Sequence, residues 1–229
     1  AFGAFQRLLA DYDGPRLHET IRGFHDTPAR LAALGRAIAA DHRGRVAEVK
    51  DEIEFVRSRA ADAGELARRQ ADGELPERIV HNDAKIANVL LDEHSGQAVC
   101  VVDLDTVMPG LALHDFGDMV RSMTCRAAED EPDVSTVRVE AELFAGLARG
   151  YLAEANAFLL PAERELLVRA GWVITLEQAA RFLADYLDGD RYYKISRPTQ
   201  NLDRTRTQIA IVESLETQWS ALETTISAI

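Results

Sequence analysis

The residues best suited to chemistry lie in one polar segment and just beyond it. They are, in chain order, His81, Asp83, Lys85, Asn88 and, after two apolar runs, Asp103. An aspartate in such a loop accepts the proton of an attacking hydroxyl, and a lysine near a transferred phosphoryl group offsets its charge. Asparagine and aspartate oxygens are ligands that Mg²⁺ prefers. This order of parts is that of kinase phosphoryl transfer, with a catalytic loop first and a second metal carboxylate after it.

The apolar runs around Ser95-Gly96 predict two buried strands joined by a two-residue hairpin turn, because glycine supplies the positive φ that such turns need. Pairing about that turn sets Asn88 opposite Asp103. Opposed residues on a ladder lie roughly 5 Å apart, so the Asn88 amide oxygen and the Asp103 carboxylate should converge on one Mg²⁺ ion.

His81 and three further residues of this stretch have two interpretations each. Asp105 follows Asp103 by two positions, so an extended strand would point both to one face; Asp105 is either a second metal ligand or a solvated acid. His81 fits a packed residue that orients the loop better than a proton carrier. Asp115 and Asp118 fit a helix start, with Asp115 as N-cap and Asp118 in the first turn. Their functional alternative is to brace the catalytic loop from beneath.

Composition bounds the remaining possibilities. The chain has 229 residues, 47% of them hydrophobic, which is enough for one good core. A net charge of −12 argues against a nucleic-acid partner. No apolar run reaches membrane-spanning length and no signal segment opens the chain, so we expect no membrane partner. We predict that Cys100 lies in a strand and Cys125 in a helix, both as buried thiols. Free thiols of this kind favour a cytoplasmic location.

Helical periodicity covers most of the rest, so the fold class predicted is α+β, mainly helical with a small β-hairpin at the catalytic site. The first helix should pack Phe2, Phe5, Leu8 and Leu9 on a core, and Thr27 should cap the second. The predicted helices span residues 1–10, 28–41, 45–66, 137–155 and 162–187. His25 and its polar neighbours lie in a loop whose spacing fixes no geometry, so no metal site is inferred there.

The segment from 188 to 208 collects aromatic rings, guanidiniums and amides before a final helix. These are the side-chain types that commonly bind a polyhydroxyl substrate. We expect substrate contacts from Tyr193, Arg197, Asn201 and Arg204. The alternative is a salt-bridged loop that caps the C-terminal helix.

With these residues in view, the chain resembles the aminoglycoside-phosphotransferase-like kinases, and within them the N-acetylhexosamine 1-kinases. The matching stretches are HETIRGFHDTPARL, VHNDAKIANVLLDE, VCVVDLDTVMPGLALHDFGDMVRS and RPTQNLDRTRTQ. The catalytic-loop motif is shared across the superfamily, whereas DLDTVMPG and QNLDRTRTQ favour the hexosamine-kinase branch.

The resemblance implies a bilobal, protein-kinase-like fold, of which residues 1–229 form the C-terminal lobe. Within it, residues 1–75 would be a helical region, 76–121 the catalytic and metal-binding segment, and 122–229 a helical, substrate-side region. The ATP-binding N-terminal lobe of such kinases is not found in this sequence, so we expect the chain alone to turn over slowly or not at all. The surface where that lobe docks would be apolar and predicts self-association.

The resemblance also implies Asp83 as base, Asn88 and Asp103 as Mg²⁺ ligands, and ATP as co-substrate. The resulting hypothesis is a kinase that phosphorylates the anomeric hydroxyl of an N-acetylhexosamine. Acidic residues near the site raise an alternative, a choline- or aminoglycoside-type phosphotransferase, which the Arg-rich C-terminal segment disfavours. A third hypothesis is a non-catalytic, kinase-like binding module.

Overall fold

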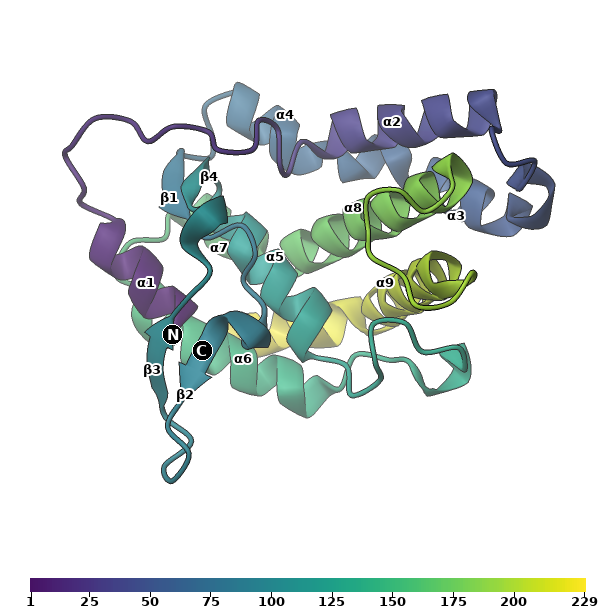
Figure 1. Cartoon of the computed structure of the whole chain (residues 1–229). Coiled ribbons are helices and arrows are strands. Elements are labelled where there is room, and N and C mark those ends of the chain that lie inside the picture. Colours follow the sequence, from purple (N-terminus) through teal and green to yellow (C-terminus); the bar gives the residue numbers. More distant parts are fainter.

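The helix α8 (Leu167–Asp188) lies at the centre of the computed structural model, which describes residues 1–229 (Figure 1). It packs most extensively against α2 (Thr27–Ala40), α5 (Ala112–Met123) and α9 (Gln200–Ser227). α8 carries buried residues on nearly every face, most of them apolar, as expected for a helix that is enclosed by others. The sequence thereby places its longest apolar helix in the core.

The other helices surround this centre, and the four strands form two small antiparallel sheets, β1–β4 and β2–β3. The helices are α1 (Phe2–Leu9), α3 (Lys50–Ala63), α4 (Glu65–Ala71), α6 (Ala141–Ala155) and α7 (Pro161–Glu165). The strands are β1 (Arg78–Val80), β2 (Val89–Leu91), β3 (Ala98–Val101) and β4 (Met108–Gly110). Short 3₁₀ helices are η1 (Val46–Glu48), η2 (Ile86–Asn88), η3 (Leu104–Thr106) and η4 (Val134–Thr136).

The predicted helices are present, but several boundaries were wrong. The predicted helix 45–66 is divided into η1, α3 and the first residues of α4, with Gly64 between the two α-helices. The predicted helix 137–155 begins only at Ala141, and 162–187 is divided into α7 and α8. The N-cap of α2 is Asp26, which accepts from the Ala29 amide at 3.0 Å, because the Thr27 hydroxyl instead donates to Glu177.

The inner face of α1 differs from the predicted one. Phe2 is buried as expected, but Leu8 is 69% exposed and Gln6 is 2% exposed. Gln6 is buried because its amide is satisfied on both sides: it donates to Asp115 at 2.7 Å and accepts from the Tyr151 hydroxyl at 2.7 Å. A polar residue thus occupies a position that periodicity assigns to an apolar one.

The predicted hairpin is present, but its predicted register was wrong by one residue. Val89 lies opposite Val101, and the Val102 amide donates to the Asn88 carbonyl at 2.9 Å, so Asn88 is not opposite Asp103. The expected positive φ occurs at Gly96, +67°, yet the loop holds four residues rather than two. The cause is Asp92, whose carboxylate accepts from backbone amides within the loop and stabilises a wider turn.

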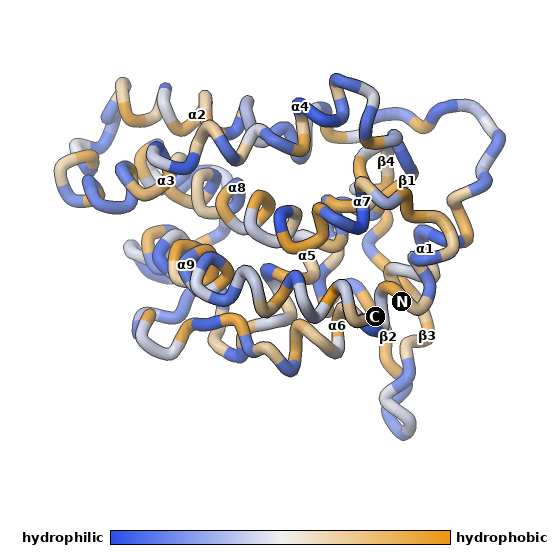
Figure 2. The backbone as a smooth tube through the Cα atoms, turned by 180° about the vertical axis from the view of Figure 1, so that it is seen from behind, coloured by the Kyte–Doolittle hydropathy of each residue, from blue (hydrophilic) through white to orange (hydrophobic).

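The two strands of this hairpin are not buried, contrary to the prediction. Val99 is 68% exposed and Leu90 53% exposed, and the hairpin projects from the helical body in Figure 1. Figure 2 shows hydrophobic colour along β2 and β3 and a polar tip. Cys100 is accordingly exposed, and Cys125 lies half-buried just beyond the end of α5 rather than in a helix. No helix in the chain has the length and apolarity needed to cross a bilayer.

Candidate active site

The polar loop 81–85 is held between β1 and η2, so both ends are anchored in regular structure. β1 pairs with β4, which places Ile79 opposite Pro109. His81 is fully buried, and its Nε2 lies 3.0 Å from the carbonyl oxygen of Val102. This contact joins the loop to the end of β3, next to Asp103. Two segments about twenty residues apart in sequence therefore meet at one place.

Three predicted site residues lie in direct contact. Lys85 Nζ is 2.7 Å from Asp83 Oδ2, and Asn88 Nδ2 donates to the same oxygen at 2.9 Å. Burial disfavours the charged form of Asp83, but the hydrogen bond and charge of Lys85, with the Asn88 amide, outweigh it and hold the pKa of Asp83 below its ordinary value. Asp83 is therefore a carboxylate at neutral pH, the state that a general base requires.

The side chain of Asn88 is oriented by a second bond, because Nδ2 also donates to the Asp83 carbonyl at 2.8 Å. Both amide hydrogens point toward Asp83, so the amide oxygen, the only atom of this group that can bind a cation, has no protein partner. Asp103 has an exposed carboxylate without a protein hydrogen bond and a left-handed backbone, φ +63°. These free oxygens fit the donor set that Mg²⁺ takes beside substrate phosphates.

Asp105 does not share a strand face with Asp103, contrary to the prediction. β3 ends at Val101, and Asp105 lies in η3. Its carbonyl accepts from the Thr20 hydroxyl at 2.8 Å, and its side chain is exposed. No group of three or more His, Cys, Asp or Glu residues is arranged to hold a metal ion, so any cation here would rest on few protein ligands, water and substrate.

Asp115 lies directly beneath the loop. Its two oxygens accept from the backbone amides of His81 at 2.9 Å and Asn82 at 2.6 Å. It is not the N-cap that the sequence predicted, because α5 begins at Ala112 and Asp115 is wholly buried in its first turn. These contacts are those of the alternative interpretation, in which Asp115 supports the catalytic loop from beneath.

The same loop is held on another side by residues that the sequence analysis did not select. His25 Nε2 lies 2.9 Å from the Asn82 carbonyl, and His25 Nδ1 lies 2.9 Å from Glu177 of α8. Thr27 donates to the other Glu177 oxygen at 2.6 Å. The only signal for His25 in the sequence was that the stretch FHDTPARL lies in a segment that resembles the kinase family. The spacing of residues in that segment did not indicate what His25 does.

Asp118 is in the second turn of α5, not the first as predicted. One of its oxygens binds Arg121 at 2.8 Å, while Oδ2 is buried without a partner. Arg121 also binds Glu129 at 2.7 Å, and Glu129 lies 3.8 Å from Arg204 Nε. A chain of charges thus runs from α5 to the start of α9.

The C-terminal residues predicted to contact substrate are mostly paired within the chain. Arg197 binds Asp130 at 2.8 Å, and the fully buried Asn201 donates to Asp185 at 2.8 Å. The Tyr193 ring packs on Phe182, and its hydroxyl accepts from Gln178. Arg204 donates to Asn201 through one terminal nitrogen, but its buried Nε has no hydrogen-bond partner. No hydrogen bond joins these four residues to Asp83 or Asn88.

An ionised aspartate beside a lysine, an asparagine with a free amide oxygen and a second aspartate nearby fit the site of an ATP-dependent phosphotransferase. The family model of the phosphotransferase enzyme family (APH) matches residues 1–166. The chain belongs to this family and is a phosphotransferase. Membership implies ATP as phosphoryl donor and usually a divalent metal ion.

The matched region contains the whole catalytic loop, Asp103 and α5, and it ends before α8. The mainly helical architecture with small antiparallel sheets is compatible with a kinase-like lobe. The segment 188–208 lies outside the match, so family membership carries no information about the residues predicted there to bind substrate.

Proposed function

We propose that this protein phosphorylates an N-acetylhexosamine, at the anomeric hydroxyl, with ATP as donor. The observation that carries the phosphotransfer part is the contact of Lys85 and Asn88 with the Asp83 carboxylate. The sugar part rests on the resemblance of the DLDTVMPG and QNLDRTRTQ stretches to N-acetylhexosamine 1-kinases.

In this proposal each residue has one task. Asp83 orients the acceptor hydroxyl and takes its proton, and Lys85 offsets charge on the transferred phosphoryl group. Asn88 and Asp103 would hold Mg²⁺, which when bound neutralises charge on the ATP phosphates. His81 orients the loop through its contact with Val102. Positioning and electrostatics then supply most of the rate enhancement.

The acceptor is proposed to bind where α5 and the start of α9 carry buried polar atoms without hydrogen-bond partners. Asp118 Oδ2 and Arg204 Nε are buried polar atoms without partners, and each such atom costs about 1–3 kcal/mol unless a ligand satisfies it. A polyhydroxyl acceptor offers both the donor that Asp118 lacks and the acceptor that Arg204 lacks. Tyr193 would supply an apolar wall, which Asn201 would hold through Asp185, since Asp185 accepts from both the Asn201 amide and the Tyr193 N–H. Arg197 would maintain the start of α9 through its ion pairs with Asp130 and Asp203.

We also propose that the chain is the C-terminal lobe of a bilobal kinase and that an N-terminal lobe of the same protein covers the ATP. The support is the exposed apolar hairpin, where Leu90, Leu91 and Val99 are each more than half exposed. Such a patch associates when left uncovered. Residues 1–229 alone should therefore self-associate in light scattering, and the pair Leu90→Lys and Val99→Lys should reduce it. A strictly monomeric chain would refute this part. A cytoplasmic location is part of the same proposal.

One acceptor alternative has a specific observation in its favour. The chain carries −12 net charge, and Asp118 and Glu129 are acidic residues at the proposed acceptor site. An anionic wall attracts a cation such as choline or an aminoglycoside. A non-catalytic binding module is the other alternative, and it is disfavoured by the presence of Asp83, Asn88 and Asp103 together.

The test is ³¹P NMR of the intact protein with Mg-ATP and, separately, N-acetylglucosamine, N-acetylgalactosamine and choline. The proposal predicts a new sugar-1-phosphate resonance, which disappears in Asp83→Asn and persists in Asp13→Asn, a matched change at an exposed aspartate. Phosphocholine instead would move the assignment to the cationic acceptor. Unchanged ATP with every acceptor would remove the hexosamine assignment.

A further inference from the structure

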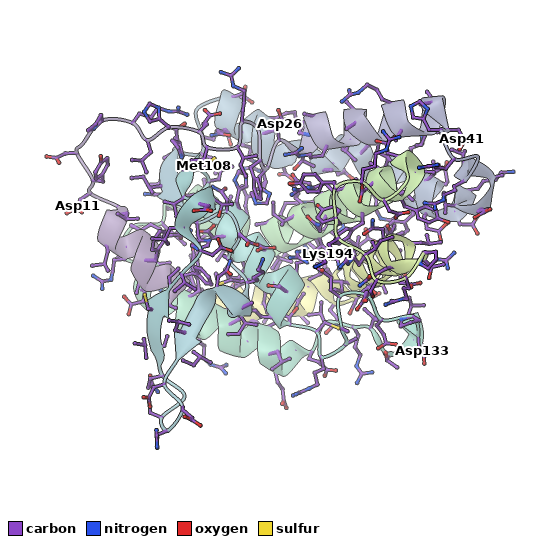
Figure 3. All side chains as sticks on the ribbon, in the orientation of Figure 1. Asp11, Asp26, Asp41, Met108, Asp133 and Lys194 are labelled. Carbon is purple, nitrogen blue, oxygen red and sulfur yellow. The ribbon has the colours of Figure 1, made fainter.

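The side chain of His25 is buried in the loop before α2, next to Asp26, which Figure 3 labels. It is 5% exposed and bridges two distant parts of the chain. Nδ1 lies 2.9 Å from Glu177 Oε1, and Nε2 lies 2.9 Å from the carbonyl oxygen of Asn82. The ring therefore connects the central helix α8 to the residue that directly precedes Asp83.

Both partners of the ring are oxygen acceptors when Glu177 is ionised. A carbonyl cannot donate, so Nε2 must carry a proton. Nδ1 then either donates to a Glu177 carboxylate or accepts from a protonated Glu177, and the two arrangements differ by the position of one proton. Thr27 donates to Glu177 at 2.6 Å, and the Arg181 guanidinium lies 3.8 Å away. Both favour the carboxylate, so His25 carries two ring protons.

The other charged and titratable groups around His25 are consistent with a positive ring. Burial opposes its charge, but Glu177 outweighs that effect and raises the pKa of His25, with a smaller contribution from Asp118 of α5. The ring of His114, also on α5, lies 4.9 Å from His25, and burial together with the charge of His25 lowers the pKa of His114 to about 3. His114 is thus neutral beside a charged neighbour. Arg181 faces Glu177 rather than His25.

The contact acts on a backbone that needs support. Asn82 has φ +65°, a left-handed conformation that costs a non-glycine residue roughly 1 kcal/mol. Its amide nitrogen donates to Asp115 at 2.6 Å, its side chain donates to the Thr106 carbonyl at 3.0 Å, and its carbonyl accepts from His25. The backbone N–H, the backbone carbonyl and the side-chain nitrogen of Asn82 are thereby fixed. The peptide that joins Asn82 to Asp83 is held at both of its polar atoms: its carbonyl accepts from His25 at 2.9 Å, and its N–H donates to His81 Nδ1 at 3.3 Å, so the His25 bond is the shorter of the two.

From this geometry we infer that His25, kept as an imidazolium by Glu177, is a positioning residue that fixes the Asn82–Asp83 peptide and with it the direction of the Asp83 carboxylate. The catalytic part of the inference rests on the proposed role of Asp83 as base. A displacement of about 1 Å at a reacting group can cost about 10²-fold in rate. Loss of the His25 bond should therefore lower kcat much more than it changes KM.

The charge of His25 is tested by a pH titration followed by ¹⁵N NMR of its ring. Glu177→Gln keeps the side-chain shape and removes the charge, so His25 should keep two protonated ring nitrogens to a higher pH in the unaltered protein than in Glu177→Gln. Loss of the second ring proton at the same pH in both proteins would overturn the inference.

The positioning role is tested by kinetics and by the Asp83 amide resonance in three variants. His25→Phe removes both donors and should lower kcat about 10- to 100-fold with KM within about threefold. His25→Gln keeps one donor for the Asn82 carbonyl and should recover part of this loss. His18→Gln is the matched control and should change neither kcat nor the Asp83 resonance. Thermal melts confirm that each variant folds.

The pH profile adds a readout that a purely structural role would not move. In the unaltered protein, kcat should fall as the pH rises through the raised pKa of His25, and in Glu177→Gln this fall should shift to lower pH. Full kcat together with an unshifted Asp83 amide in a folded His25→Phe would overturn the inference. If no acceptor is phosphorylated at all, the proposed function fails, while the ring protonation and the Asp83 amide shift still decide whether His25 holds this peptide.

Discussion

The catalytic loop and the C-terminal segment 188–208 are both rich in polar side chains, yet they use them in opposite ways. In the loop, the backbone is held by buried groups from other elements, Asp115 and His25, while Asn88 and Asp103 keep oxygen atoms without protein partners. In the C-terminal segment, the side chains are mostly bonded to one another. Arg197 is bound to Asp130 and Asp203.

The difference separates residues that can act on a ligand from residues that maintain a shape. A side-chain atom left free while its own backbone is fixed is preorganised, since it pays no reorganisation cost when a ligand arrives. A guanidinium already held by two carboxylates must break those bonds first. We therefore expect large kinetic effects from the loop and small ones from most of the C-terminal segment.

The largest effect within this comparison should come from the free oxygens. Asn88→Ala and Asp103→Ala should each lower kcat about 10²-fold or more at fixed Mg-ATP, because each removes an oxygen proposed to hold the metal. Part of the loss should be recovered at higher Mg²⁺ concentration. Steady-state kinetics across a Mg²⁺ titration measure both. Asp105→Asn is the matched comparison, and an equal loss there would make Asp105 a metal ligand as well.

The buried groups under the loop should show themselves in the pH dependence of stability. Burial, followed by the charge of His25, lowers the pKa of His114 to about 3 from its ordinary 6.5. Below pH 6.5 the unfolded chain binds a proton that the folded chain does not, so this group lowers stability progressively as the pH falls from 6.5 toward 3. At pH 5 the loss is about 2 kcal/mol.

His114→Gln removes this loss. Urea denaturation of both proteins at pH 7 and pH 5 should show the unaltered protein losing about 2 kcal/mol more than the variant over that interval. Equal losses in the two proteins would mean that His114 becomes protonated in the folded chain.

The smallest effects should fall in the C-terminal segment and should differ between its two arginines. Arg204→Ala removes a buried nitrogen without a partner and should raise the acceptor KM about tenfold with kcat little changed. Arg197→Ala breaks partly exposed ion pairs, which are weak because solvent screens them, so KM should stay within about threefold. A larger effect at Arg197 would reverse the contrast between the two regions.

The sequence predicted what depends on local pattern and spacing. The hairpin and the positive φ of Gly96 lie within short stretches whose residue types constrain them. The spacing also selected Asp83, Lys85 and Asn88 as site residues, although their direct contact was not predicted. The predicted register was wrong for two reasons: Asp92 stabilises a loop two residues longer than the simplest one, and an irregularity between Leu90 and Leu91 adds one unpaired residue on β3. A shift of one residue was enough to move Asn88 away from Asp103.

The buried polar residues that hold the loop could not be predicted in this way. Gln6 lies 109 positions from Asp115, and His25 lies 152 positions from Glu177. Polar side chains inside a core have no periodic signal, because their burial depends on one partner far along the chain. Likewise, the role of Asp115 depended on where α5 begins, and the turn after β4 sets that start.

The most direct test of the account is the single-turnover rate of phosphoryl transfer in Asp83→Asn, with ATP affinity measured alongside and Asp13→Asn as the control. Asp83 as general base predicts a loss of about 10²- to 10⁴-fold in rate, unchanged ATP affinity and full activity in the control. A rate within a few-fold of the unaltered protein would contradict the account and would require a different base for the reaction.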